Sequence, residues 1–88
     1  MTRADVFETL KRNVQEVLFD VEENSITMET SLLDLGANSV ERVDIITQSM
    51  EQLNFSIPVM ELSGARSLGG LVNLFYEKLT QEAASRTP

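Results

Sequence analysis

The chain has 88 residues, enough for one domain, and 42% of them are apolar, enough for one small core. It contains no cysteine and no histidine, which excludes disulfides, thiolate nucleophiles, zinc fingers and the commonest general base. Seven basic residues against fourteen acidic ones give a formal charge of −7, which disfavours binding to nucleic acid or to an anionic membrane. We therefore expect a small, cytoplasmic, monomeric domain that binds no nucleic acid, membrane or metal.

The first predicted helix runs from Ala4 to about Phe19. Thr2 followed by Asp5 has the spacing of an N-terminal capping box. Apolar residues then recur at helical spacing and form one stripe: Val6, Phe7, Leu10, Val14, Val17 and Leu18.

Residues 20–36 predict a long loop that is anchored to the core. A connection of this length with no contacts of its own would be unusual in a small domain. We expect a short helical turn over residues 31–35, before Gly36. The anchors that we expect are the apolar residues Val21, Ile26, Met28, Leu32, Leu33 and Leu35.

The second predicted helix opens at Asn38 and Ser39. Asn38 is a favourable N-cap, and Glu41 three residues later completes a second capping box. The helix should end near Asn54, because Pro58 follows and proline disfavours helix in the residue before it. Its apolar stripe is Val43, Ile46, Met50 and Leu53, widened by Ile45.

Two further helices complete the prediction of an all-α four-helix bundle with a long first loop. The third is short and covers residues 58–62, with Pro58 at its start, where a missing N–H does no harm. The last begins near Ser67 and buries Leu68, Leu71, Val72, Phe75 and Leu79. Gly69 and Gly70 each weaken its first turn by about 1 kcal/mol relative to alanine, which indicates either close packing there or a soft helix end. Residues 81–88 are polar and predict a flexible tail.

The residue types exclude most catalytic sites. Serine cannot pair with a histidine, because there is none. Lys11 and Lys78 lie on helix faces that we expect to be exposed to solvent, and the acidic residues fall outside the apolar stripes. We therefore predict no catalytic residue, no metal site and no enzymatic activity.

Ser39 is the one residue whose position indicates chemistry. It lies at the start of a helix, where unpaired N–H groups and the helix dipole favour an attached phosphate. On local spacing alone, a simple capping role for Ser39 is the better explanation.

The segment Leu35-Gly36-Ala37-Asn38-Ser39-Val40, followed by an amphipathic helix and Ile57-Pro58, resembles the acyl carrier protein family. The resemblance covers essentially the whole chain and implies a four-helix bundle that is a carrier and not an enzyme. It implies that a phosphopantetheinyl transferase moves 4′-phosphopantetheine from coenzyme A onto Ser39, and that the thiol of this arm then carries acyl groups. Residues 1–80 would form the carrier domain, followed by the tail at 81–88.

The resemblance also implies a surface for partner enzymes on the second helix. Val40, Asp44, Thr47 and Glu51 would lie on its exposed face, whereas Val43, Ile46 and Leu53 would lie in the core. The full set that we predict for docking is Asn38, Val40, Glu41, Arg42, Asp44, Thr47 and Glu51.

The segment from Gly36 to Arg42 resembles a narrower group, the discrete donor carriers of polyketide β-branching. Asn38 departs from the aspartate of the common family signature, which puts recognition by the usual transferase in question. In this group an acyltransferase loads malonyl, a ketosynthase-like decarboxylase converts it to acetyl, and a 3-hydroxy-3-methylglutaryl synthase homologue uses the acetyl group. The alternatives are a fatty-acid carrier, a peptidyl or aryl carrier, or a helical interaction domain in which Ser39 is only a cap.

The acidic excess lies directly before Ser39. No lysine or arginine occurs between Arg12 and Arg42, and this stretch holds Glu16, Asp20, Glu22, Glu23, Glu29, Asp34 and Glu41. Such a run can be a solvated surface or a docking face for basic partners. Its place next to Ser39 favours docking.

Overall fold

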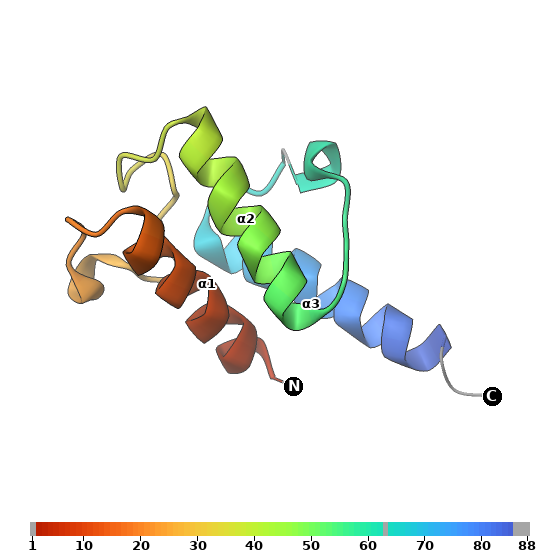
Figure 1. Cartoon of the computed structure of the whole chain (residues 1–88). Helices are drawn as coiled ribbons and strands as arrows, with labels where there is room; N and C mark the ends of the chain where they lie inside the picture. Colours follow the sequence, from red (N-terminus) through yellow and green to blue (C-terminus); the bar gives the residue numbers. More distant parts are fainter. Residues whose placement is uncertain (1, 63, 86–88) are drawn as a thin grey trace.

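The computed structural model describes residues 2–62 and 64–85, and it confirms the all-α prediction (Figure 1). Three α-helices run over Arg3–Val17 (α1), Ser39–Leu53 (α2) and Leu68–Ser85 (α3). Two short 3-10 helices cover Glu23–Ser25 (η1) and Val59–Leu62 (η2), the second of which is the predicted short third helix. The described residues contain no strand.

Helix α1 packs against both α2 and α3, and these two make fewer contacts with each other. The core between the three helices is apolar and includes the edge-to-face pair Phe55–Phe75, with ring centroids 5.0 Å apart. Residues that the predicted stripes share with the observed core include Val6, Leu10, Val14, Ile46, Met50, Leu53, Leu71 and Phe75. The low contact between α2 and α3 leaves room for the cavity described below.

Helix α1 begins with the predicted capping box. The backbone N–H of Asp5 donates to Thr2 Oγ1 (3.2 Å), and the backbone N–H of Thr2 donates to Asp5 Oδ2 (2.9 Å). The backbone hydrogen bond from Thr2, followed by the bond from its side chain, lowers the pKa of Asp5. Two backbone N–H groups at the helix start, which have no carbonyl partner within the helix, thereby gain side-chain acceptors.

A buried polar network joins α1 to α2, and it was not predicted from the sequence. The Asn13 amide nitrogen donates to Ser49 Oγ (2.8 Å), to Gln52 Oε1 (3.1 Å) and to the Thr9 carbonyl (3.1 Å). Asn13 and Ser49 are both fully buried. Because a buried amide needs its partners in place, this network fixes the register of the two helices.

The first loop is anchored to the core by only part of the predicted set. Ile26 and Leu32 are buried, but Met28 and Leu33 are 39% and 67% exposed, so the prediction for these two is wrong. A second anchor is the ion pair from Lys11 Nζ to Glu23 Oε1 (2.9 Å), which makes Lys11 half-buried rather than solvent-facing as predicted. The predicted short helical turn over residues 31–35 is present, because the Leu35 N–H donates to the Ser31 carbonyl (3.2 Å), and the chain continues as a turn to Gly36.

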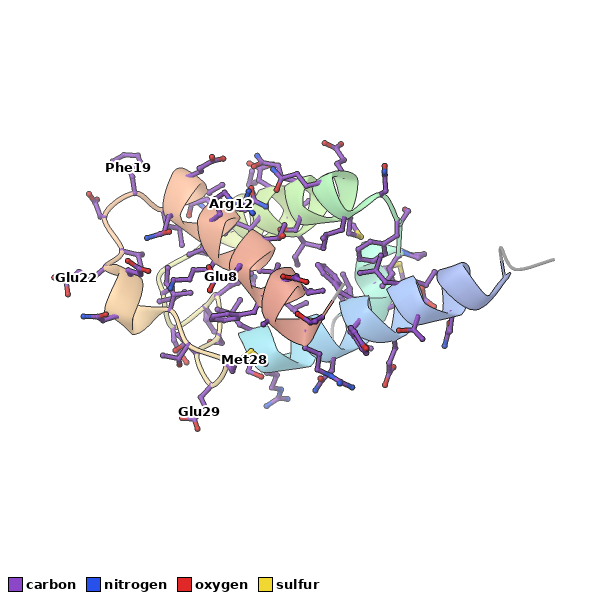
Figure 2. All side chains as sticks on the ribbon, turned by 90° about the horizontal axis from the view of Figure 1, so that it is seen from below. Glu8, Arg12, Phe19, Glu22, Met28 and Glu29 are labelled. Carbon is purple, nitrogen blue, oxygen red and sulfur yellow. The ribbon has the colours of Figure 1, made fainter. Side chains whose placement is uncertain are left out.

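Acidic and aromatic side chains of the same region point into solvent. Figure 2 shows Phe19, Glu22 and Glu29 directed away from the helices, at the end of the molecule where the first loop lies. Phe19 is 82% exposed and therefore lies outside the apolar stripe of α1. Glu22 and Glu29 of the acidic stretch thus lie on a solvent-exposed surface of the first loop.

The start of α3 is held to the first loop by backbone hydrogen bonds. Leu68 N donates to the Thr30 carbonyl and Gly69 N donates to the Met28 carbonyl, both at 2.8 Å. A Cβ on Gly69 would lie 2.9 Å from the Met28 carbonyl oxygen, whereas one on Gly70 would come no closer than 3.4 Å to any neighbour. Close packing is therefore the reason for glycine at position 69.

Helix α3 continues to Ser85, five residues beyond the predicted end of the ordered part. Gln81 and the Glu-Ala-Ala sequence after it are favourable helix formers, so the backbone of the predicted tail is helical as far as Ser85. The rest of that tail lies outside the described residues. None of the helices in the described part of the chain is long and apolar enough to cross a membrane.

Candidate functional site

Ser39 is the first residue of α2, and its side chain is exposed. The capping box before it forms as predicted: the Glu41 N–H donates to Asn38 Oδ1 (2.8 Å), and the Asn38 N–H donates to Glu41 Oε1 (2.9 Å). Asn38 is therefore the residue that caps the helix. Because Asn38 performs this role, the Ser39 hydroxyl is left available at the surface.

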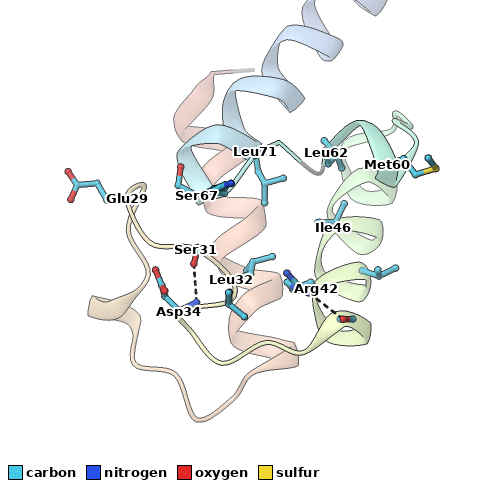
Figure 3. Close-up of a pocket in the computed structure, with 15 residues that line it drawn as sticks. Glu29, Ser31, Leu32, Asp34, Arg42, Ile46, Met60, Leu62, Ser67 and Leu71 are labelled. Atoms are coloured by element: carbon cyan, nitrogen blue, oxygen red, sulfur yellow. Dashed lines mark hydrogen bonds between the residues drawn. The ribbon is translucent and has the colours of Figure 1, made fainter.

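Arg42 lies one turn further along α2 and reaches back to Ser39. Its Nη2 donates a hydrogen bond to Ser39 Oγ with a distance of 3.3 Å (Figure 3). Arg42 is half-buried, since its side chain lies along the wall of a cavity. The Ser39 hydroxyl thus has a fixed positive charge directly beside it.

A cavity of about 780 Å³ opens next to Ser39 and Arg42 (Figure 3). It lies between α2, the segment around η2, the start of α3 and the first loop. The first loop supplies Glu29, Ser31, Leu32, Leu33 and Asp34, and the other elements supply Ser39, Arg42, Val43, Ile46, Met60, Leu62, Ala65, Arg66, Ser67 and Leu71. The cavity therefore combines an apolar wall with two arginines and two acidic residues.

Val43 corrects the sequence-based prediction. It was expected in the core, but its side chain is 42% exposed and lines the cavity. Each residue of a helix advances by about 100°, which places Val43 at the edge of the arc that holds Ile45, Ile46 and Met50. Because α2 and α3 make few contacts with each other, this edge of α2 lines the cavity instead of packing against α3.

The residues predicted for docking divide into two groups. Asn38 and Glu41 are engaged in the cap, whereas Val40 is 69% exposed and its side chain lies at the surface. Asp44 and Glu51 are exposed, and Thr47 is half-buried. Spacings of four, seven and eleven residues from Val40 put these three on its side of α2.

Two exposed apolar residues line the site, although neither of them was assigned to it from the sequence. Met60 is 86% exposed and Leu33 is 67% exposed, and both line the cavity. Periodicity could not identify them, because Leu33 lies in a loop and Met60 in a four-residue 3-10 helix. With Val43, they add apolar surface to the wall of the cavity.

The site has the groups that a phosphate-linked arm needs. Ser39 offers an exposed hydroxyl, Arg42 offers a cation, and the adjoining cavity offers an apolar surface for a flexible chain. In the described residues, no three acidic side chains come close enough together to hold a metal ion. The arrangement thus fits a covalently attached phosphodiester.

Comparison with known proteins agrees with this geometry. The model of the family "Phosphopantetheine attachment site" matches residues 8–75. A "Polyketide biosynthesis acyl-carrier-protein AcpK" of Bacillus subtilis is 39% identical over 79 residues, which are 90% of this chain and 96% of the relative. An "Acyl carrier protein" of Clostridium perfringens is 34% identical over 82% of this chain and 95% of its own. A third relative, "Highly reducing polyketide synthase aurA" of Calcarisporium arbuscula, is 30% identical over 81% of this chain, which corresponds to 3% of that much longer protein.

The family match covers most of the chain, and two of the relatives align over nearly their whole length. Such proteins carry phosphopantetheine and are not enzymes themselves. Their partners include phosphopantetheinyl transferases and, for the polyketide-associated members, polyketide synthase enzymes. The chain belongs to the acyl carrier protein family.

Proposed function

We propose that Ser39 receives 4′-phosphopantetheine from coenzyme A, in the cytoplasm. The observation that carries this proposal is its exposed hydroxyl beside the Arg42 guanidinium, within the residues that match the attachment-site family. Ser39 Oγ forms a bond to the phosphorus next to pantetheine, and the bond from that phosphorus to adenosine 3′,5′-bisphosphate breaks. The hydroxyl proton goes to a base of the transferase. The start of α2 stabilises the resulting phosphodiester, because its N–H groups and dipole favour negative charge.

The test is a mass measurement after incubation with coenzyme A and a broad-specificity phosphopantetheinyl transferase. The wild-type chain should gain the mass of one phosphopantetheine, and Ser39→Ala should gain none. Ser67→Ala is the matched control, because Ser67 also precedes a helix and lines the same cavity, but its Oγ accepts a hydrogen bond from Gly70 N (3.1 Å). Full modification of Ser39→Ala would contradict the proposal.

We further propose that the protein is a donor carrier for polyketide β-branching. The support is the segment from Gly36 to Arg42, which resembles such donors, together with the 39% identical relative that is named for polyketide biosynthesis. In this role an acyltransferase loads malonyl onto the arm. A ketosynthase-like decarboxylase then releases carbon dioxide and leaves acetyl. A 3-hydroxy-3-methylglutaryl synthase homologue joins this acetyl unit to the β-carbonyl of a chain on a second carrier.

The acyl group can be tested with defined thioesters. A broad-specificity transferase installs malonyl, acetyl or aminoacyl arms from the corresponding coenzyme A esters. We expect the decarboxylase to remove carbon dioxide from the malonyl form, and the synthase homologue to consume only the acetyl form. Rejection of the acetyl form by the synthase homologue, with turnover of the malonyl form by a fatty-acid ketosynthase, would instead identify a fatty-acid carrier.

We propose that partner enzymes bind the exposed side of α2 next to Ser39. The exposure of Val40, Asp44 and Glu51 on one side of the helix supports this proposal, as does the acidic surface of the adjacent loop. All seven predicted residues stay in the proposed surface: Asn38, Val40, Glu41, Arg42, Asp44, Thr47 and Glu51. A partner with a basic surface fits this charge.

A further inference from the structure

We infer that Arg42 is the residue that binds the phosphodiester of the arm on Ser39. This inference rests on the proposed modification of Ser39 and adds a positioning residue to it. In the unmodified chain Arg42 would hold the hydroxyl, and in the modified chain it would hold a phosphate oxygen. The arm would then leave the protein surface in a direction that Arg42 determines.

The distance between the two side chains supports this role. Arg42 Nη2 lies 3.3 Å from Ser39 Oγ, longer than most N–H···O hydrogen bonds. In a phosphodiester at Ser39 the phosphorus is bonded to Oγ, and the two non-bridging oxygens, two bonds beyond Oγ, share a full negative charge. Charge-assisted bonds of this kind are shorter, about 2.7–2.9 Å, and roughly twice as strong as neutral ones. Modification would therefore convert a long contact between Arg42 and a neutral hydroxyl into a short ion pair between Arg42 and a phosphate oxygen.

The charge of Arg42 is available for such a contact. Among the described residues, no carboxylate forms an ion pair with Arg42. The adjacent acid, Glu41, instead accepts a hydrogen bond from the Asn38 N–H (2.9 Å) in the cap of α2. Position 38 itself is neutral, so no acidic side chain next to Ser39 competes with the phosphate. A phosphate at Ser39 would thus be the first anion to pair with this guanidinium in the part of the chain that the structure describes.

The other charged groups of the cavity lie on different elements. Glu29 and Asp34 belong to the first loop, and Figure 3 shows them across the cavity from Arg42. Arg66 follows η2 and lines the same cavity, but it makes no hydrogen bond to Ser39 within the described part of the chain. Arg66 therefore serves as the control, because its removal changes the charge of the cavity equally without touching Ser39.

The experiment compares wild type, Arg42→Gln, Arg42→Lys and Arg66→Gln, each fully converted to the modified form and checked by mass. The ³¹P resonance of the phosphodiester should be displaced in Arg42→Gln, partly restored in Arg42→Lys and unchanged in Arg66→Gln. In wild type, the ¹⁵N–¹H signal of the Arg42 side chain should shift on modification, while that of Arg66 stays in place. Added salt should move the wild-type ³¹P resonance toward that of Arg42→Gln, because the pair is partly exposed.

Several outcomes would overturn the inference. One is a ³¹P resonance in Arg42→Gln equal to that of wild type, and another is an equal displacement in Arg66→Gln. An Arg42 side-chain signal that does not respond to modification of the wild-type chain would refute it without any variant. Failure of the wild-type chain to gain mass at Ser39 would instead refute the proposed function, so the two failures are distinguishable.

Discussion

Replacing Gly69 by alanine would push a methyl group against the backbone of the first loop. The new Cβ would lie 2.9 Å from the Met28 carbonyl oxygen, which is closer than real Cβ atoms approach. That oxygen also accepts the Gly69 N–H, and the neighbouring Thr30 carbonyl accepts the Leu68 N–H, both at 2.8 Å. Because the obstacle is backbone, the loop must move, and these hydrogen bonds must lengthen.

The magnitude follows from three opposing effects. Alanine in place of glycine in a helix gains up to about 1 kcal/mol. Overpacking costs about 1–3 kcal/mol, and each weakened hydrogen bond costs up to about 1.5 kcal/mol. We therefore expect Gly69→Ala to lower the free energy of unfolding by about 1–2 kcal/mol. Gly70→Ala gains the same helix propensity, and its Cβ meets nothing closer than 3.4 Å, so it should raise stability by up to about 1 kcal/mol.

Urea and thermal unfolding followed by circular dichroism measure both variants. In a domain of this size 1 kcal/mol corresponds to about 4–8 °C in the midpoint of melting. Gly69→Ala should melt below wild type, and Gly70→Ala at or above it. Equal midpoints for the two variants, or a higher one for Gly69→Ala, would refute the close packing of the loop against α3.

Three further predictions concern other parts of the chain. In a double-mutant cycle with Asn13→Ala and Ser49→Ala, urea unfolding should give a coupling of roughly 1 kcal/mol, and additive effects would contradict the buried network. The bonds from Thr2 lower the pKa of Asp5 below its ordinary 3.8, so the stability from this carboxylate is present above that pH and is lost as the pH falls through the lowered value. Asp5→Asn should therefore flatten the acid limb of the stability profile in thermal melts, and an unaltered limb would count against the cap. Asp44→Lys should slow association with the transferase in stopped-flow measurements, and the wild-type rate should fall as salt rises; a rate independent of salt would indicate apolar docking.

Local sequence signals predicted the backbone of the site well. Both capping boxes could be recognised, because a cap depends on residues three positions apart and not on the rest of the fold. The burial of Val6, Leu10 and Val14 followed from spacing alone. These features are set within one or two turns of helix.

The features that the sequence did not predict depend on how the elements pack. Periodicity places Val43 on the apolar stripe of α2, but only the separation of α2 from α3 turns it toward a cavity. The side chains of Met28 and Leu33 were expected to be buried as anchors, but they are exposed. The loop instead contacts α3 through the backbone carbonyls of Met28 and Thr30. Asn13 is polar and was not expected in the core, because its partners come from another helix.

The contact between Arg42 and Ser39 shows the same limit at the site itself. Their separation by three residues permits a contact on a helix, but the sequence left open whether Arg42 faces a partner, a phosphate or its own helix. The side-chain geometry places the guanidinium at the hydroxyl. Because this contact lies within the residues that match the attachment-site family, it supports the proposal that Ser39 carries the arm.

The most direct test of the central proposal is to locate the modification within the sequence. Trypsin should release residues 13–42 as one peptide, since no lysine or arginine lies between Arg12 and Arg42. This peptide contains Ser25, Ser31 and Ser39, so fragmentation can distinguish them. After incubation with coenzyme A and a transferase, the added mass should first appear in the fragments that include Ser39 and be absent from those ending at Asn38. Added mass on another serine, or none on this peptide, would contradict the proposal that Ser39 carries the arm.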